Sequence, residues 1–393
     1  MVQEEARVSG WIRRLLITSK EMALQKTIGA SPAYTSGNRV TLVKGGEAYF
    51  SLLISLVNKA KYSIHLQTYI FDGDETGRKV ASVLRGAAQR GVKVYLLLDG
   101  YASQHLSEEL IRQMKNDGIH FRWFSPLLRT KYFYFGRRLH QKVLVTDAVY
   151  SLVGGINISN RYNDMPGKPA WLDWAVYAEG NVSRELFYLC VDLWNKSAWE
   201  EKKKELIFPE IRIRMPEPGS MVRVRRNDWV RGKNQISRSY AEMFRKSASH
   251  IYIMSSYFLP GKAIRRNISA AVKRGVKITV IAAGKSDVWT AKQAERYIYE
   301  WLLRNGITLY EYLPNVLHAK LSTYDGKWVT AGSYNVNNIS AYAAIELNLD
   351  ILDETFAMDV ESKIKTIIQN DCVLIDRESF FRKNTFFKKL VER

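Results

Sequence analysis

Two histidines in this chain each stand two residues before a lysine at the start of a β-branched, apolar run. They are His140 with Lys142 in LHQKVLVTDAVYSLVGGIN and His318 with Lys320 in LHAKLSTYDGKWVTAGSYN. Side chains two apart on a strand share a face, so each imidazole projects together with its ammonium group. A lone histidine in such a strand is more often a core residue than a catalyst. The same pair in two matching places favours catalysis.

These residue types suit the breaking of a phosphodiester bond. Lysine ammonium groups and amide donors can neutralise the phosphate charge, and charge also moves onto the leaving oxygen as the bond breaks. One imidazole can attack phosphorus while the other protonates the leaving alcohol. None of these groups requires a divalent metal, and we expect neither a metal nor another cofactor.

Other segments of the chain also recur, so the chain is a duplicated unit. AAQRGVKVYLLLDG (87–100) returns as AAVKRGVKITVIAAG (270–284), and GIHFRWF (118–124) returns as GITLYEY (306–312). Each copy alternates helices with strands, and Arg-Gly ends one helix of each copy. The alternation predicts an α/β fold of two repeated domains, each with a mixed, largely parallel sheet covered by helices. The expected divisions are an N-terminal segment (1–40), a first domain (41–205), a linker (206–233), a second domain (234–376) and a C-terminal tail (377–393).

The charge of the chain predicts an anionic partner. The 59 basic and 39 acidic residues give a formal net charge of +20, which suits either nucleic acid or an anionic membrane surface. No apolar run approaches the ~20 residues that span a bilayer, and the N-terminus lacks the pattern of a signal peptide. We therefore expect the protein on the cytoplasmic side.

Three segments that mix aromatic and basic residues favour a membrane. RVSGWIRRLLITSKEMALQK, which contains Trp11, has the pattern of a helix lying in the interface, although a helix packed on the domain would look the same. The tail FFRKNTFFKKLVER repeats this composition. Ahead of the first motif, Tyr132, Phe133 and Phe135 lie among cations and could enter lipid. The same alternation could instead stack single-stranded bases.

The spacing of both motifs resembles the phospholipase D superfamily signature H-x-K-x4-D-x6-G-S-x-N. The second copy matches it in full, at His318, Lys320, Asp325, Gly332, Ser333 and Asn335. The first copy matches at His140, Lys142, Asp147, Gly154 and Asn157, but Gly155 stands where serine is usual. Segments such as LLLDGYASQHLSEELI and YFLPGKAIRRNISAAVKRGVKI are similar to those of bacterial cardiolipin synthases of the peripheral type without transmembrane helices. The resemblance covers roughly residues 40–375.

The resemblance implies a site at a pseudo-twofold interface between the two domains. It makes His140 the nucleophile that becomes a phosphohistidine, and His318 first the acid and then the base. The groups expected to hold the phosphate are Lys142, Lys320, Asn157, Asn335 and Ser333, together with the N–H of Gly155, which glycine would leave freer to approach the ligand.

Four carboxylates complete the expected site. The family places an acid after each motif, and we expect Asp173 to orient His140 and Glu346 to orient His318. Asp147 and Asp325 belong to the catalytic motifs, but their place at the turn after each strand suits them to hold backbone rather than to touch substrate.

The resemblance implies a cardiolipin synthase, which moves a phosphatidyl group from a donor phospholipid to phosphatidylglycerol. The donor is phosphatidylglycerol or, as an alternative, phosphatidylethanolamine. The protein would act as a peripheral enzyme on the cytoplasmic face of an anionic phospholipid membrane, with no obligate protein partner. A hydrolytic phospholipase D, a nuclease of the same superfamily and a non-catalytic binder of membrane or nucleic acid are the alternatives.

Overall fold

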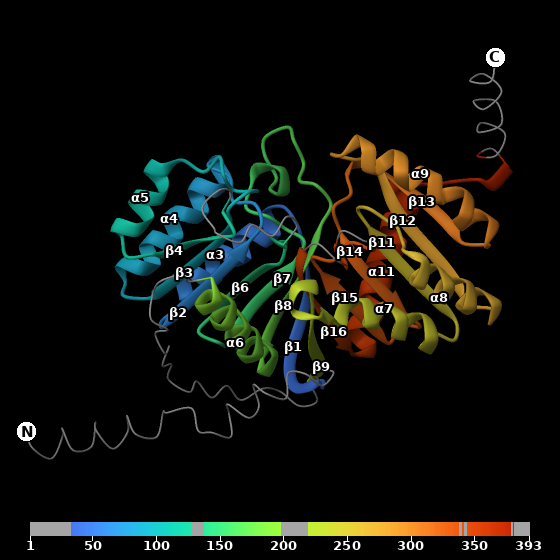
Figure 1. Cartoon of the computed structure of the whole chain (residues 1–393), viewed down its shortest axis with the longest axis horizontal. Coiled ribbons are helices and arrows are strands. Elements are labelled where there is room, and N and C mark those ends of the chain that lie inside the picture. The colour runs from blue at the N-terminus through green and yellow to red at the C-terminus, as the bar shows by residue number, and fades with distance from the viewer. Residues whose placement is uncertain are drawn as a thin grey trace, which may run out of the picture.

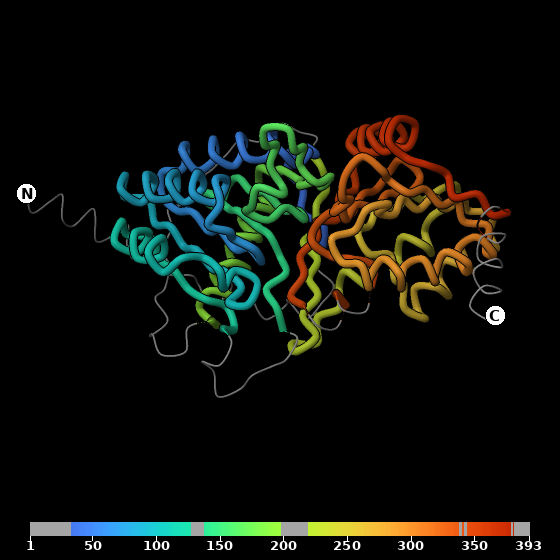
Figure 2. The backbone as a smooth tube through the Cα atoms, turned by 90° about the horizontal axis from the view of Figure 1, so that it is seen from above, coloured from blue at the N-terminus to red at the C-terminus, as the bar shows by residue number. Residues whose placement is uncertain are grey.

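The computed structural model describes residues 33–126, 137–197, 219–337, 340–341, 344–378 and 380. It consists of two α/β halves that lie side by side, with β1 and β9 between them (Figure 1). Seen from above, the same two halves flank a central seam (Figure 2). Of the helices in the described part of the chain, none combines the length and the apolar character needed to cross a membrane.

The two halves repeat one order of elements. The first half contains β1 (Thr35–Lys44), α3 (Glu47–Lys59), β2 (Ser63–Thr68), α4 (Glu75–Gln89), β3 (Lys93–Asp99), α5 (Glu108–Asn116), β4 (His120–Phe124), β5 (Arg138–Leu139), β6 (Lys142–Thr146), β7 (Tyr150–Gly154), β8 (Trp174–Gly180) and α6 (Asn181–Lys196). The second half contains β9 (Ser220–Asp228), β10 (Lys233–Asn234), α7 (Gln235–Lys246), β11 (His250–Ser255), α8 (Lys262–Lys273), β12 (Lys277–Lys285), α9 (Trp289–Arg304), β13 (Thr308–Val316), β14 (Lys320–Tyr324), β15 (Trp328–Gly332), β16 (Ala344–Leu352), α11 (Glu354–Asp371) and β17 (Cys372–Leu374).

Local sequence sets the ends of several helices. The side chains of Asp74, Ser107 and Asp353 accept hydrogen bonds from backbone N–H groups in the first turns of α4, α5 and α11, which satisfies donors that have no partner within the helix. Gly91 and Gly275 follow the C-terminal ends of α4 and α8 with φ of 88° and 89°, the left-handed conformation that glycine adopts at low cost. These equivalent glycines confirm the predicted helix ends and give a register for comparing the repeats.

Strand pairing confirms the α/β repeats but not the expected predominance of parallel strands. The strand order is β4-β3-β2-β6-β7-β8-β1 in the first half and β13-β12-β11-β14-β15-β16-β9 in the second. Among the strands of the described residues, parallel pairing is confined to β2–β3–β4, β11–β12–β13 and the short β5–β16 pair, and two isolated bridges, Phe71↔Ile158 and Leu172↔Leu317, are parallel as well. The prediction of largely parallel sheets is wrong because β6 and β7, like β14 and β15, are joined by tight turns, which allow only antiparallel neighbours.

The region predicted as a linker, 206–233, contains part of the central sheet. Strand β9 pairs antiparallel with β16 along its length and with β1 at Thr35↔Val222 and Asn38↔Ser220. The first half also begins earlier than expected, because β1 starts at Thr35. Residues 206–218 lie outside the described residues, so the proposed domain divisions stay predictions there.

One hydrophobic core is shared by the two halves. It combines Val143, Val153 and Val176 of the first half with Leu321, Val329 and Leu349 of the second, and α6 and α11 pack against it. Each half has a further core under its other helices, around α3 and α4 in the first and around α7 and α9 in the second. The shared core holds the two motif-bearing strands, β6 and β14, at fixed positions relative to each other.

Candidate active site

Short pairings between the halves bring the two histidine motifs together. His140 lies between β5 and β6, and its neighbour Leu139 pairs with Ile345 of β16. His318 precedes β14, its neighbour Leu317 forms a bridge to Leu172, and the His318 N–H donates to the Leu172 carbonyl at 2.8 Å. Each histidine is therefore held against the segment of the other half that contains an acidic residue, Glu346 within β16 and Asp173 directly before β8.

The histidines and the acidic residues form crossed pairs. His140 Nδ1 lies 3.0 Å from Glu346 Oε2, and His318 Nδ1 lies 2.6 Å from Asp173 Oδ2. The two acids are correctly predicted as partners of the imidazoles, but the expected pairing of Asp173 with His140 and of Glu346 with His318 is wrong. The physical reason is the pairing between halves, because Asp173 follows Leu172 and Glu346 follows Ile345 directly in the chain.

The crossed pairs define which ring nitrogens can react. The Glu346 carboxylate accepts a hydrogen bond from His140, so Nδ1 of His140 carries the proton and Nε2 carries the lone pair. His318 Nδ1 lies between Asp173, whose pKa burial raises to about 7, and Lys320 Nζ at 3.0 Å, which leaves Nε2 as its free nitrogen too. Burial lowers the pKa of His140, although the Glu346 carboxylate opposes this shift. Burial, with the nearby ammonium groups of Lys320 and Lys142, holds the pKa of His318 well below its usual value. Both imidazoles are therefore neutral near pH 7 in the free protein.

The motif lysines are buried cations that lie next to the histidines. Lys142 Nζ donates to the His140 carbonyl at 2.5 Å. Lys320 Nζ donates to the His318 carbonyl and, at 2.9 Å, to Ser256 Oγ. Burial lowers the pKa of Lys142 to about 7 and that of Lys320 to about 8. An anion bound between them would reverse this shift, because an opposite charge favours the protonated form.

The two motif asparagines have different surroundings. Asn157 accepts from the Ile70 N–H at 3.1 Å and donates to the Tyr162 hydroxyl at 2.8 Å, and that hydroxyl lies 3.5 Å from His318 Nε2. In the other half, Asn335 Oδ1 is buried and has no hydrogen-bond partner among the described residues. Asn157 is thus part of a chain of polar groups that ends at one imidazole.

The serine of the second motif forms a hydrogen bond to the acid of its half, whereas the glycine of the first leaves room for the acid of its half. Ser333 Oγ donates to Glu346 Oε2, so this hydroxyl supports the partner of His140. A Cβ at Gly155 would lie 2.5 and 2.6 Å from the two carboxylate oxygens of Asp173. The Gly155 N–H donates to the Trp174 carbonyl at 3.3 Å, so the expectation that it is free to approach the phosphate is wrong.

The motif aspartates hold backbone, as their position in the sequence predicted. Asp147 accepts from the N–H groups of residues 61–63 at 2.8 to 2.9 Å, and Asp325 accepts from those of residues 248–250 at 2.7 to 2.9 Å. Both adopt positive φ, 53° and 51°, in the turn after the motif strand. They fix the start of β2 and of β11 against the motif strands β6 and β14.

Three residues near the imidazoles were not predicted from the sequence. They are Tyr162, Tyr69, whose ring centroid lies 5.2 Å from Lys142 Nζ, and Ser256, which accepts from Lys320. Tyr69 and Ser256 each directly follow the last residue of the equivalent strands β2 and β11. A comparison of the repeats at this position could have found the last two.

The aromatic residues predicted to contact the membrane, Trp11, Tyr132, Phe133 and Phe135, lie outside the described residues. The same holds for most of the two terminal segments. Their roles stay predictions.

Comparisons with known proteins find matches to both halves of the chain. A family model described as "Cardiolipin synthase, PLD-like domain" matches residues 53–166 and 240–368, one match in each half. Cardiolipin synthase B of Salmonella typhi is 32% identical over 360 residues, which cover 90% of this chain and 86% of that protein. Cardiolipin synthase B of Escherichia coli K12 is 30% identical over 365 residues, with the same coverage. The crystal structure of phosphatidylserine synthase from Haemophilus influenzae shares the fold, with a TM-score of 0.64 at 14% identity over 94% of this chain and 97% of that one.

Proposed function

Because the chain belongs to the cardiolipin synthase family of phospholipase D-like proteins, we propose that it transfers a phosphatidyl group from a donor phospholipid to phosphatidylglycerol and so makes cardiolipin. The observation that carries this proposal is the crossed arrangement of two neutral imidazoles, each held by a carboxylate of the other half. Two buried lysines lie beside them. Such a site can supply a nucleophile, a proton donor and positive charge around one phosphodiester.

In the first step, His140 Nε2 attacks phosphorus and the bond from phosphorus to the leaving alcohol breaks. His318 gives a proton to the departing oxygen, and the phosphatidyl group stays on His140 as a phosphohistidine. For this step His318 must be protonated, and the charge of the bound phosphodiester raises its pKa. In the second step, the terminal hydroxyl of phosphatidylglycerol loses its proton to His318 and attacks phosphorus, and the bond from phosphorus to His140 breaks.

The difference between the two histidines supports this assignment. The His140 side chain is 19% exposed, whereas that of His318 is 9% exposed. The hydroxyl of Tyr162 also faces His318 Nε2. The more open imidazole has more room for a phosphatidyl group, and the more enclosed one is better suited to hold a proton away from water.

Lys142, Lys320, Asn157 and Asn335 are proposed to hold the phosphate oxygens. The pKa values of the lysines support this role, since burial without an anion is unfavourable for an ammonium group. Asn335 Oδ1, which has no partner in the described part of the chain, can accept a hydrogen bond from a hydroxyl of the lipid headgroup. We assign Ser333 to the support of Glu346 rather than to the phosphate, because of its hydrogen bond to that carboxylate.

The proposed setting is the cytoplasmic face of an anionic membrane, where the protein binds peripherally. The net charge of +20 supports an anionic surface. Phosphatidylglycerol is the proposed acceptor, and phosphatidylglycerol or phosphatidylethanolamine is the donor. Water in place of the acceptor hydroxyl would give the hydrolytic reaction of a phospholipase D at the same site.

The test is mass spectrometry of lipids after incubation of the purified protein with phosphatidylglycerol vesicles. We expect cardiolipin and glycerol from the wild type, and neither from His140→Ala or His318→Ala. His105→Ala, which removes an exposed histidine elsewhere in the first half, is the matched control and should leave the rate unchanged. Phosphatidate as the only product would replace the transferase with a hydrolase, and no turnover would refute both.

A further inference from the structure

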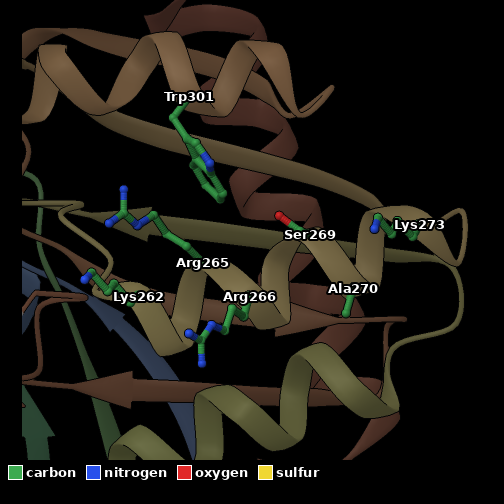
Figure 3. A pocket seen from close by; sticks show the side chains of 7 residues that line it. All are labelled: Lys262, Arg265, Arg266, Ser269, Ala270, Lys273 and Trp301. Atoms are coloured by element: carbon green, nitrogen blue, oxygen red, sulfur yellow. The ribbon is translucent and has the colours of Figure 1, made fainter.

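A groove between α8 and α9 of the second half is lined by basic side chains. It has a volume of about 450 Å³ and is lined by Lys262, Arg265, Arg266, Ser269, Ala270, Lys273 and Trp301. Figure 3 shows the basic side chains along α8 with Trp301 reaching toward them from α9. The Arg265 guanidinium lies 5.8 Å from the ring centroid of Trp301. None of the four cations forms an ion pair with a described acidic residue.

The first half shows that the fold does not require this charge. Aligned on Gly91 and Gly275, which end α4 and α8 with the same backbone conformation, the cluster can be compared position by position. Arg265, Arg266 and Lys273 correspond to Ala81, Ser82 and Gln89 of α4. Three of the four groove cations therefore have uncharged counterparts in a helix of the same architecture.

A contact beside these positions also differs between the two halves. In the first half, Arg85 of α4 forms an ion pair with Asp117 at the end of α5. At the equivalent place in the second half, Ser269 donates to the side-chain oxygen of Asn305 at 3.1 Å. The ion pair of the first half is thus replaced by an uncharged pair in the second, so no carboxylate stands at this place beside the groove cations. A binding site for anions requires such surroundings.

The position of the groove connects it to the proposed active site. Strands β11 and β12 are parallel, so α8 and α9 both begin at the edge where these strands end. Ser255, the last residue of β11, pairs with Lys320 at the start of β14. Trp289, the first residue of α9, is 73% exposed, and Tyr297, which lies further along the same helix, is 84% exposed. Exposed tryptophan and tyrosine are typical of the level of lipid headgroups.

We propose that the α8–α9 groove binds the anionic headgroups of a phospholipid bilayer and holds the active-site edge of the second half against the membrane. The cations extend from Lys262 to Lys273 along a helix of 12 residues, about 18 Å at the rise of an α-helix. This length exceeds one phosphate group and suits a surface of several headgroups. The proposal rests on the proposed function only in that the substrate is a lipid of that bilayer.

The test compares two triple variants of the full chain. Arg265→Ala, Arg266→Ser and Lys273→Gln together install the residues that α4 carries at the equivalent positions. Arg78→Gln, Lys79→Gln and Lys93→Gln together remove the same charge from exposed positions of the first half and serve as the matched control. Each protein is sedimented with vesicles of equimolar phosphatidylglycerol and phosphatidylcholine, and its turnover of monomeric short-chain phosphatidylglycerol is measured.

We expect the α8 variant to partition onto these vesicles roughly 100-fold less than the wild type, with unchanged turnover of the monomeric substrate. The control variant should bind within a few-fold of the wild type. Equal losses of vesicle binding in both variants would overturn the proposal, because binding would then depend on the total charge of the protein and not on the groove. Loss of binding to a single-stranded oligonucleotide, with vesicle binding intact, would overturn it in favour of nucleic acid. A wild type that binds vesicles through the groove but turns over no lipid would refute the proposed function and leave the groove proposal standing.

Discussion

Replacing Gly155 with the serine that is usual in the motif will impair the enzyme, although it completes the signature of the first copy. A Cβ at residue 155 would lie 2.5 and 2.6 Å from the carboxylate oxygens of Asp173, whereas ordinary contact begins at 3.4 Å. The backbone here is held by the hydrogen bond from Gly155 to the Trp174 carbonyl. The side chain of Asp173 must therefore move by about 1 Å.

This displacement acts on the reaction through His318. The His318–Asp173 hydrogen bond is 2.6 Å long, and a shift of about 1 Å takes it beyond hydrogen-bond distance. A displacement of this size at a catalytic group costs on the order of 100-fold in rate. We expect kcat of Gly155→Ser to fall by about this factor.

The second half suggests how the loss can be reversed. There, Ser333 coexists with a glutamate, Glu346, to which it donates a hydrogen bond. The double variant Gly155→Ser, Asp173→Glu reproduces this pair in the first half. We expect it to be at least tenfold more active than Gly155→Ser. Gly155→Ala is the matched control for the clash, because it adds the Cβ without the hydroxyl.

The assay is the initial rate of cardiolipin formation for the wild type, both single variants at residue 155, Asp173→Glu and the double variant, with circular dichroism to confirm folding. Gly155→Ser and Gly155→Ala should lose activity alike. Wild-type activity in Gly155→Ser, or a double variant whose loss is the product of the single losses, would refute the steric coupling of these two positions.

Three further predictions follow from the site. Glu346→Gln weakens the nucleophile His140 and should slow formation of the phosphohistidine by ~10²-fold or more, whereas Asp173→Asn acts through His318, the acid and then the base, and should slow both formation and breakdown; rapid-quench trapping with labelled lipid measures both rates, and an unchanged rate of formation in Glu346→Gln would contradict the crossed pairs. Asp325→Ala removes the acceptor of three backbone N–H groups and should lower the free energy of unfolding by ~1–3 kcal/mol, seen in denaturant titration, with a smaller loss for Asp325→Asn. The motif lysines, with pKa values lowered to about 7 and about 8, lose their protons as pH rises, so kcat/KM should decline above pH 7; a profile that stays flat to pH 9 would contradict their role in binding the phosphate.

The sequence predicts the chemical groups of this site better than the contacts between the two halves that pair them. The H-x-K spacing places each imidazole and its lysine at the start of a strand in both repeats, and the structure brings the two motifs together. The partners of the imidazoles were predicted in the wrong combination. Whether Asp173 meets His140 or His318 depends on the bridge from Leu172 to Leu317, and no spacing within one repeat encodes a contact between repeats.

The same distinction applies to the fold. Alternating helices and strands predict the α/β repeat, but the order of β6 and β7 in the sheet follows from a tight turn at Asp147, which the motif had already placed at the end of a strand. Strand β9, SMVRVRRND, was predicted as part of a linker because the stretch 206–233 is rich in proline and charged residues. Its arginines are buried instead, and Arg223 and Arg225 form ion pairs with Asp350 of β16. Those partners lie more than a hundred residues away in the chain.

The most direct test of the proposed mechanism is to identify the residue that carries the phosphatidyl group during turnover. The wild type, Glu346→Gln and Asp173→Asn are quenched at alkaline pH while they convert phosphatidylglycerol, and their peptides are analysed by mass spectrometry. We expect a phosphatidyl group on His140, together with release of glycerol and formation of cardiolipin. A phosphatidyl group on His318, or cardiolipin formed without a phosphohistidine at any quench time, would contradict it.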